Sequence, residues 1–195
     1  GVNSIYLNED KMGFLPNHYV IEDRFVAEDR ADEVNAMNGP QKWFGNYLQY
    51  CLSGDDVNWI NVRMRYDQHE NFPFFSPDIA RQAWTGGSVT YICMQLAYYL
   101  GVKTLYLVGF DHHYVIPEDA KIDGLDITSQ SDDPNHFHPD YFGKGYRWHD
   151  PMVDRMELGY KKAGLFFERD RRRIFNATAG GKLECFERVD FRNLF

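Results

Sequence analysis

Hydrophobic and polar positions follow a helical spacing and then a strand-like run in the middle of the chain. Residues 89–100 carry apolar side chains on one helical face and stop before Gly101, which predicts a helix with a glycine C-cap. Residues 104–110 form a near-continuous apolar run, typical of a parallel strand that is covered on both faces. With the small-residue turn at 85–88 in front of the helix, this order predicts a β/α crossover.

The same patterns predict the other elements. We expect helices over 23–37 and 151–170, and strands over 18–22, 42–52, 57–64 and 173–177. The last helix is expected to begin at an N-cap, Asp150. Its candidate core positions are Met152, Met156, Tyr160, Leu165 and Phe166. The chain contains no internal repeats or linkers, so we predict a single α/β domain over residues 1–195. Its expected form is a Rossmann-like, open, mostly parallel sheet with helices on both faces.

The segment 111–150 is the exception to these patterns, because no periodicity continues through it. A stretch of this length without regular structure is uncommon in a compact domain and usually indicates a functional loop. Five of the seven histidines fall between His112 and His149. We therefore predict a long functional loop over 111–150, with imidazoles suited to proton transfer near neutral pH.

Composition narrows the function classes. The 29 acidic and 21 basic residues give a net charge of −8, which argues against a nucleic-acid partner because phosphate-backbone affinity needs clustered Lys and Arg. No apolar run approaches the roughly 20 residues of a membrane helix, so no transmembrane segment is expected. Three widely spaced cysteines and the lack of a signal-peptide pattern predict a reduced, cytoplasmic protein.

Two turns along the predicted crossover could bind a ligand. Gly86, Gly87 and Ser88 open a helix, where unpaired backbone N–H groups suit a phosphate, although the alternative is an ordinary helix start capped by Ser88. The strand over 104–110 ends in Asp111, followed at once by histidines and a tyrosine, and ligands of open α/β sheets bind beyond such strand ends. The alternative is that Asp111 caps a loop and the histidines lie in solvent.

Two further motifs are candidates. His136 lies in a histidine-rich loop and is a candidate general base, with a solvated loop as the alternative. A metal site at His136 and His138 is the other alternative, but no third ligand follows at a recognised spacing. Asn176 follows the predicted strand 173–177 and would lie beside Asp111 if the two strands are parallel neighbours. A plain glycine turn is the alternative there.

These motifs occur in an order that resembles the bacterial sialyltransferases that use CMP-activated sialic acid. Gly86-Gly87-Ser88, the helix, and Tyr106 to Asp111 resemble that family's nucleotide- and donor-binding portion. Asn135-His136-Phe137, followed by Gly143, resembles its Ser-His-Tyr-x-Gly segment. A closer resemblance is to an uncharacterised branch allied to 6-hydroxymethylpterin diphosphokinase. The family's first strand and Gly-Asn-Gly loop have no counterpart here, so we expect the native domain to extend beyond the N-terminus.

The resemblance implies a nucleotide-binding domain that acts as a glycosyltransferase on a nucleotide-activated sugar, most simply a CMP-linked one. It implies His136 as general base, His113 or Tyr114 as support for the leaving phosphate, and Asn3 as a nucleotide contact. It also implies that phosphate or nucleotide is bound by the following residues: Gly86, Gly87, Ser88, Asp111 and Asn176. The expected partners are the donor and a sugar or glycan acceptor, with a homo-oligomer left open.

No cofactor is required by this scheme. One alternative is a pterin or nucleotide diphosphokinase with Mg²⁺ at Asp111 and its neighbours. The other is a nucleotide- or sugar-binding module without catalysis.

Overall fold

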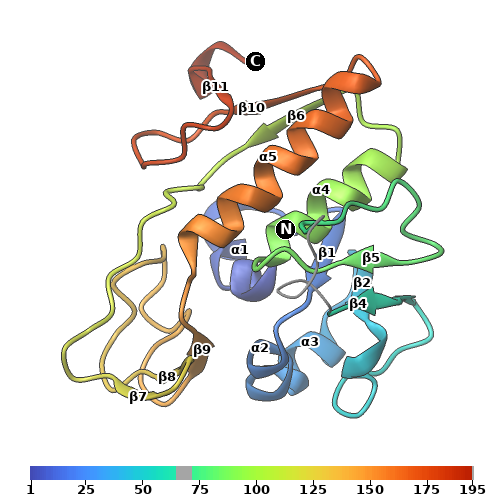
Figure 1. Cartoon of the computed structure of the whole chain (residues 1–195). Coiled ribbons are helices and arrows are strands. Elements are labelled where there is room, and N and C mark those ends of the chain that lie inside the picture. Colours follow the sequence, from blue (N-terminus) through green and yellow to red (C-terminus); the bar gives the residue numbers. More distant parts are fainter. Residues whose placement is uncertain (65–71, 195) are drawn as a thin grey trace. The chain divides into compact units, whose positions relative to one another are not determined.

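The computed structural model describes residues 1–64 and 72–194, which form a mixed α/β structure with mostly parallel and some antiparallel strand pairs (Figure 1). The chain divides into two compact units. Unit 1 comprises Gly1–Val62 and Tyr114–Asp150, and unit 2 comprises Arg63–His113 and Pro151–Phe195. The mixed α/β class is thus confirmed, whereas the Rossmann-like arrangement stays a prediction.

Unit 1 is built on a parallel sheet of order β1-β2-β3, in which Ile21 lies opposite Phe44 and Phe44 opposite Trp59. Its first elements are η1 (Asn3–Asn8), α1 (Glu9–Met12), β1 (His18–Ile21), α2 (Arg24–Asp29), α3 (Ala31–Ala36), β2 (Gln41–Gly45), η2 (Asn46–Leu48) and β3 (Val57–Ile60). One face of the sheet packs against the helices. The core comprises Tyr19, Ile21, Val26, Ala27, Val34, Met37, Phe44, Leu48 and Leu52.

Three expected elements of unit 1 are interrupted. The single helix predicted over 23–37 is two helices, because Arg30 leaves helical geometry at φ −125° and turns its guanidinium inward over the ring of Tyr146. The strand predicted over 42–52 stops at Gly45 and continues as η2, which carries Leu48 into the same core. The strand predicted over 57–64 is divided at Asn61 into β3 and β4 (Val62–Arg63).

The segment 111–150 also differs from the prediction, since it contains an antiparallel sheet of order β7-β8-β9. Its strands are β7 (Lys121–Asp123), β8 (Asp126–Thr128) and β9 (Arg147–His149). Ile127 and Trp148 pair across the sheet, and both are buried. Three-residue strands are too short to show a period of two, which explains why the sequence pattern missed them.

Unit 2 contains a parallel sheet of order β11-β10-β6, in which β10 (Arg173–Asn176) pairs with β6 (Thr104–Leu107). The condition under which Asn176 lies beside Asp111, that the two strands are parallel neighbours, is therefore met. The remaining elements are β5 (Ala83–Trp84), which pairs with β4, α4 (Val89–Tyr99), α5 (Val153–Arg169), β11 (Glu187–Arg188) and η3 (Phe191–Asn193). Helix α5 packs along α4 and against β10 (Figure 1).

Three expectations for unit 2 are corrected. Strand β6 is not covered on both faces, because Tyr106 is 43% exposed and Val108, just beyond the strand, is 55% exposed. Helix α5 has Met152 rather than Asp150 at its N-cap position. Met152 and Leu165 are exposed rather than core residues, while Met156 and Tyr160 are buried as expected.

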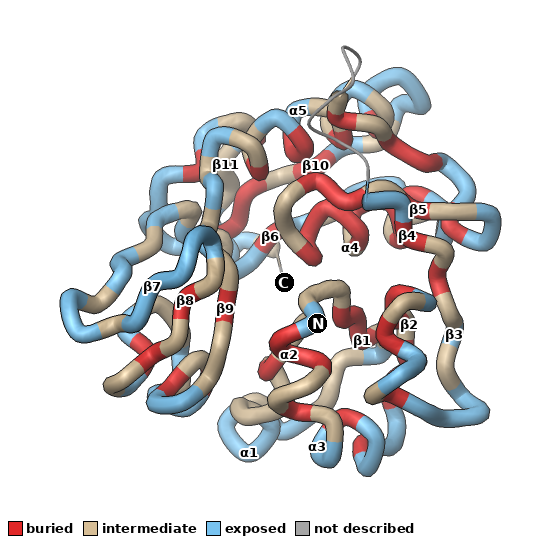
Figure 2. Tube along the Cα trace, turned by 60° about the horizontal axis from the view of Figure 1, so that its bottom comes forward, coloured by how far each residue is buried: buried red, intermediate tan, exposed pale blue. Residues whose placement is uncertain are grey.

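The core of unit 2 is aromatic and lies between α4 and α5, where buried positions follow α4 closely (Figure 2). The ring of Phe75 stacks on Phe166 at 4.4 Å and meets Tyr91 and Tyr98 edge-on. Among the helices of the described residues, none has the length and apolarity needed to cross a membrane.

Candidate functional site

The predicted general base, His136, is held by a carboxylate that is almost fully buried. Nδ1 of His136 lies 2.7 Å from Oδ2 of Asp133, whose side chain is only 2% exposed, whereas the imidazole is 25% exposed. Asp133 also accepts hydrogen bonds from the backbone N–H groups of Asn135 at 2.7 Å and Phe142 at 2.9 Å. Burial alone would raise the pKa of Asp133, but these three hydrogen bonds outweigh it and lower the pKa below its ordinary value.

This Asp133–His136 pair has the geometry of an oriented acid–base group. A carboxylate acceptor at Nδ1 favours the tautomer with hydrogen on Nδ1 and leaves Nε2 as a proton acceptor. No described residue hydrogen-bonds to Nε2 of His136. Sequence reasoning missed Asp133. The available signal was its position before Pro134-Asn135, where an aspartate commonly accepts from the N–H two residues on.

The ring of His136 lies flat on the ring of Tyr141, with centroids 3.9 Å apart and an interplanar angle of 2°. Burial raises the pKa of the Tyr141 hydroxyl. Hydrogen bonds with the side chain of Asn3 and the backbone of Ser4 oppose this shift, and the charge of Tyr114 adds to it. These contributions place Asn3 and Tyr114 close to that hydroxyl. Unit 1 thus brings together three of the predicted site residues around Tyr141.

Backbone geometry supports this grouping. Asn3 has a left-handed φ of 47°, a conformation that asparagine tolerates better than most residues, and its carbonyl accepts a 2.5 Å hydrogen bond from the hydroxyl of Tyr19. Asn135 pairs with Val115 through both ends of its amide, at 2.7 and 2.9 Å. The segment that carries Tyr114 is therefore fixed beside the loop that carries His136.

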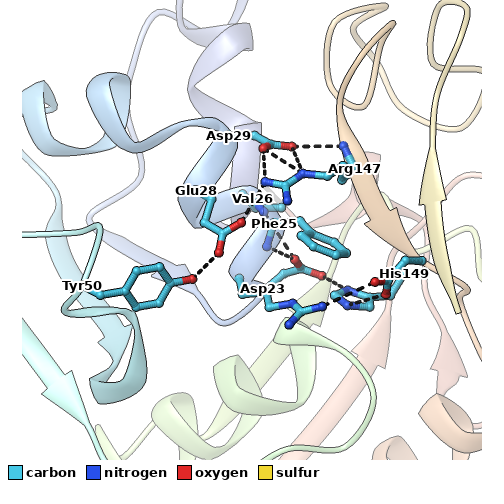
Figure 3. A network of polar contacts seen from close by, with 10 residues as sticks. Asp23, Phe25, Val26, Glu28, Asp29, Tyr50, Arg147 and His149 are labelled. Atoms are coloured by element: carbon cyan, nitrogen blue, oxygen red, sulfur yellow. Dashed lines mark hydrogen bonds and ion pairs between the residues drawn. The ribbon is translucent and has the colours of Figure 1, made fainter. Parts of the chain in front are cut away.

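A second polar network ties β9 to α2 within unit 1 (Figure 3). Asp23 caps α2 by accepting from two of its backbone N–H groups and also lies 2.7 Å from Nδ1 of His149. The ring of Phe25 stacks on His149 at 4.5 Å. The hydrogen bond with Asp23 raises the pKa of His149 above its ordinary value, although burial opposes the shift.

Arg147 contributes the other half of this network. Its side chain pairs with Asp29, and it also binds Glu28 at 2.8 Å. Its backbone N–H donates to Asp29 at 3.1 Å. Tyr50 donates a 2.5 Å hydrogen bond to Glu28, which lowers the pKa of that carboxyl. These contacts anchor the C-terminal end of the segment that holds Asp133 and His136.

In unit 2 the ends of β6 and β10 lie together, as the parallel pairing requires. The backbone N–H of Lys182 donates to the carbonyl of Asp111 at 2.7 Å, and the N–H of Phe110 donates to Oγ1 of Thr178 at 2.9 Å. Gly181 packs so closely that a Cβ there would lie 2.8 Å from Cα of Asp111. Asp111 is thus placed through its backbone, with an exposed side chain.

Asn176 is fully buried beside Asp111, and both ends of its amide are engaged by the following loop. Its Oδ1 accepts from the N–H of Thr178 at 3.0 Å, and its Nδ2 donates to the carbonyl of Leu183 at 2.8 Å. In this arrangement Asn176 shapes the loop that follows β10. Its predicted role as a ligand contact stays a prediction.

The two histidines after Asp111 point to different partners. His113 is exposed, with Nδ1 3.3 Å from Nζ of Lys182. His112 has a left-handed φ of 52°, and its side chain is only 8% exposed, with Nε2 3.5 Å from Oε2 of Glu157 on α5. Neither Lys182 nor Glu157 was predicted, since each reaches its histidine from a distant part of the sequence.

The Gly86-Gly87-Ser88 turn is enclosed more tightly than a free phosphate loop. Gly86 is buried, and a Cβ there would lie 2.3 Å from the ring of Tyr91. Ser88 caps α4 by accepting from the N–H of Thr90 at 3.2 Å, as the alternative interpretation required. A Cβ at Gly87 would meet the side chain of Arg155 at 3.5 Å.

The predicted site residues therefore form two groups. Asn3, Tyr114 and His136 belong to unit 1. The phosphate-turn and strand-end residues belong to unit 2: Gly86, Gly87, Ser88, Asp111, His113 and Asn176. In the described ranges no three His, Cys, Asp or Glu side chains are grouped so as to hold a metal ion.

Comparison of the chain with models of protein families, with curated proteins and with solved structures found no match.

Proposed function

We propose that the protein is a transferase in which His136 acts as general base toward an acceptor hydroxyl. The observation that carries this proposal is the 2.7 Å contact between Nδ1 of His136 and the buried carboxylate of Asp133. Such a carboxylate fixes the orientation and tautomer of an imidazole and stabilises the imidazolium that forms during proton transfer. Flat stacking on Tyr141 restricts the ring further.

In the proposed reaction, Nε2 of His136 takes the proton of the acceptor hydroxyl as its oxygen bonds to the anomeric carbon of the donor. The bond between that carbon and the phosphate oxygen breaks, and the electron pair leaves with the nucleotide phosphate. General-base catalysis of this kind contributes typically about 10²–10⁴-fold to the rate. Asp133 stays ionised throughout, consistent with its lowered pKa.

A nucleotide-activated sugar, most simply a CMP-linked one, is the donor that we propose. The support for this part is the ordered resemblance of the motifs at residues 86–88, 106–111 and 135–143 to the sialyltransferases. The grouping of Asn3 with Tyr141 beside His136 adds support, because the resemblance assigns Asn3 to the nucleotide.

The first experiment is calorimetric titration of CMP, CDP, UDP, GDP and ATP into the protein, each with and without Mg²⁺. Binding of CMP without Mg²⁺ supports the proposal and is followed by a screen of CMP-linked sugars for release of CMP. Binding of ATP only with Mg²⁺ would overturn it in favour of a diphosphokinase. CMP binding with no turnover of any donor would favour a binding module.

Variants of the loop test the assigned base. We expect His136→Gln to lower turnover of the donor found in the screen by about 10²–10⁴-fold without changing the affinity for CMP by more than about twofold. The matched control is His138→Gln. This change removes an imidazole of the same loop, whose Nδ1 accepts the N–H of Asp140 at 3.2 Å and lies 3.9 Å from the exposed carboxylate of that residue. Equal turnover in the two variants would refute the role of His136.

A further inference from the structure

The loop that follows β10 is shaped by one arginine, Arg188. Its Nη1 donates to the carbonyls of Gly180 at 2.6 Å and Thr178 at 3.4 Å, and its Nη2 donates to the carbonyl of Gly181 at 3.1 Å. A further bond reaches the carbonyl of Leu183 at 3.2 Å. Four carbonyl groups of this loop therefore converge on a single guanidinium.

The direction of these carbonyls determines the direction of the amide groups. In a planar trans peptide the N–H of one residue points opposite to the C=O of the residue before it. The N–H groups of Ala179, Gly181 and Lys182 therefore point away from Arg188. The N–H of Lys182 shows where they point, because it donates to the carbonyl of Asp111 at 2.7 Å. From the carbonyls of Thr178 and Gly180 we infer that the N–H groups of Ala179 and Gly181 also point to the side of the loop away from Arg188.

The side chains of Lys182 and His113 lie together beside this loop. Nζ of Lys182 is 3.3 Å from Nδ1 of His113, and an ammonium group can only donate, so Nδ1 is the acceptor. This assigns the ring hydrogen to Nε2 and makes Nε2 of His113 a donor. Lys182 keeps two further N–H groups. Ala179, Gly181, Lys182 and His113 are all exposed, so an anion can reach them.

We propose that this end of unit 2 binds a phosphoryl group between the amides of Ala179 and Gly181 and the side chains of Lys182 and His113. Successive backbone N–H groups in a loop form a concave anion site, and a cation and an imidazole donor complete it. Glycine is suited to both positions 180 and 181, which have φ of 78° and 73°. All residues of this site belong to unit 2, and the proposal does not rest on the activity proposed for His136.

The test is a titration of the ¹⁵N-labelled protein with inorganic phosphate, CMP and cytidine, followed by amide chemical shifts. We expect phosphate and CMP to shift the amides of Ala179, Gly181 and Lys182, and cytidine to leave them unchanged. We expect Lys182→Gln to weaken phosphate binding about tenfold, since one charge-assisted hydrogen bond is lost. His113→Ala should weaken it less, because the ammonium group of Lys182 remains.

The matched control is Lys103→Gln, which removes the same charge from an exposed lysine at the opposite end of the sheet, just before β6. We expect its affinity for phosphate to stay within about twofold of the parent protein. If Lys103→Gln and Lys182→Gln weakened phosphate binding equally, the effect would come from the net charge of the protein and not from a site at Lys182, and the proposal would be overturned. Absence of shifts at Ala179 and Gly181 on addition of phosphate would also overturn it.

His136→Gln separates this inference from the proposed function. The variant should bind phosphate with unchanged affinity, because His136 belongs to unit 1. Phosphate binding without any turnover would therefore leave the phosphoryl site in place while the transferase proposal fails. If Lys182→Gln kept its turnover and phosphate shifted none of the loop amides, the transferase proposal would stand and the phosphoryl site would be refuted.

Discussion

Replacing Asp133 by asparagine tests the contact on which the proposed base depends. The side chain has two oxygens that accept three hydrogen bonds, from the N–H of Asn135, the N–H of Phe142 and Nδ1 of His136. Asparagine offers one oxygen and one NH₂ group in the same volume. Whichever way the amide is oriented, its NH₂ group faces at least one backbone N–H that has lost its acceptor.

The magnitude follows from the number of bonds lost. A hydrogen bond to a charged group contributes about 1.5–3 kcal/mol, and a buried donor left without an acceptor costs about 1–3 kcal/mol. Since asparagine keeps part of the network, we expect Asp133→Asn to destabilise the loop by about 2–4 kcal/mol. The matched control is Asp132→Asn, which makes the same change of charge at the exposed neighbouring residue and should stay within about 0.5 kcal/mol.

Native-state hydrogen exchange is the suitable assay, because it reports the opening free energy of single amides. The amides of Asn135 and Phe142 should exchange faster in Asp133→Asn than in Asp132→Asn, while the buried strand residue Ile21 stays protected. Equal protection of Asn135 and Phe142 in the two variants would refute the claim that the buried carboxylate holds this loop.

The dependence of this effect on pH gives a second check with a definite sign. The pKa of Asp133 is lower in the folded protein than in the unfolded chain, where it is about 3.9. Its stabilisation is therefore fully present above about pH 4 and is lost as the pH falls through the folded-state pKa. The stability difference between Asp133→Asn and the parent protein should shrink in acid. A difference that grows below about pH 4 would contradict the lowered pKa.

Three further predictions concern the scaffold. The pKa of His149 is raised by Asp23, so the stabilisation that His149 gives to unit 1 is present below about pH 6.5 and is lost as the pH rises through its folded-state pKa. The stability gap between the parent and His149→Gln should therefore close at alkaline pH in urea titrations, and a widening gap would contradict the assignment. Gln95 of α4 is fully buried, and its Oε1 accepts the backbone N–H groups of Ser76 and Trp84, each at 3.0 Å. Gln95→Leu leaves both N–H groups without this acceptor and should cost about 2–4 kcal/mol in thermal or urea unfolding, whereas a cost below about 0.5 kcal/mol would exclude a structural role. Gly86→Ala places a Cβ 2.3 Å from the buried ring of Tyr91 and should destabilise by about 1–3 kcal/mol, so a stabilised variant would show that the turn is less tightly packed.

The parts of the fold that the sequence predicted are those specified by local patterns. Helix α4 and the strands β6 and β10 follow from helical spacing and short apolar runs. The sequence indicates the Ser88 cap only as an alternative, and the parallel pairing of β6 with β10 only as a condition. The predicted helix over 23–37 was wrong in extent, because the break at Arg30 depends on a buried guanidinium and a ring far along the chain. The antiparallel sheet β7-β8-β9 was missed because its strands are too short to show periodicity.

The chemistry of the candidate sites also depends on contacts between distant parts of the chain, which local patterns do not reveal. A histidine-rich sequence identifies His136 as a candidate, but its chemical role depends on which group faces Nδ1. Sequence reasoning did not identify Asp133, and the structure selects it because its side chain is buried against the ring while hydrogen bonds from His136 and two backbone amides keep it ionised. In unit 2, Lys182 gives His113 a defined tautomer only because the strand ends bring together residues that are 69 positions apart. Sequence patterns therefore indicate which groups can react, and long-range packing decides which atom of each group is available.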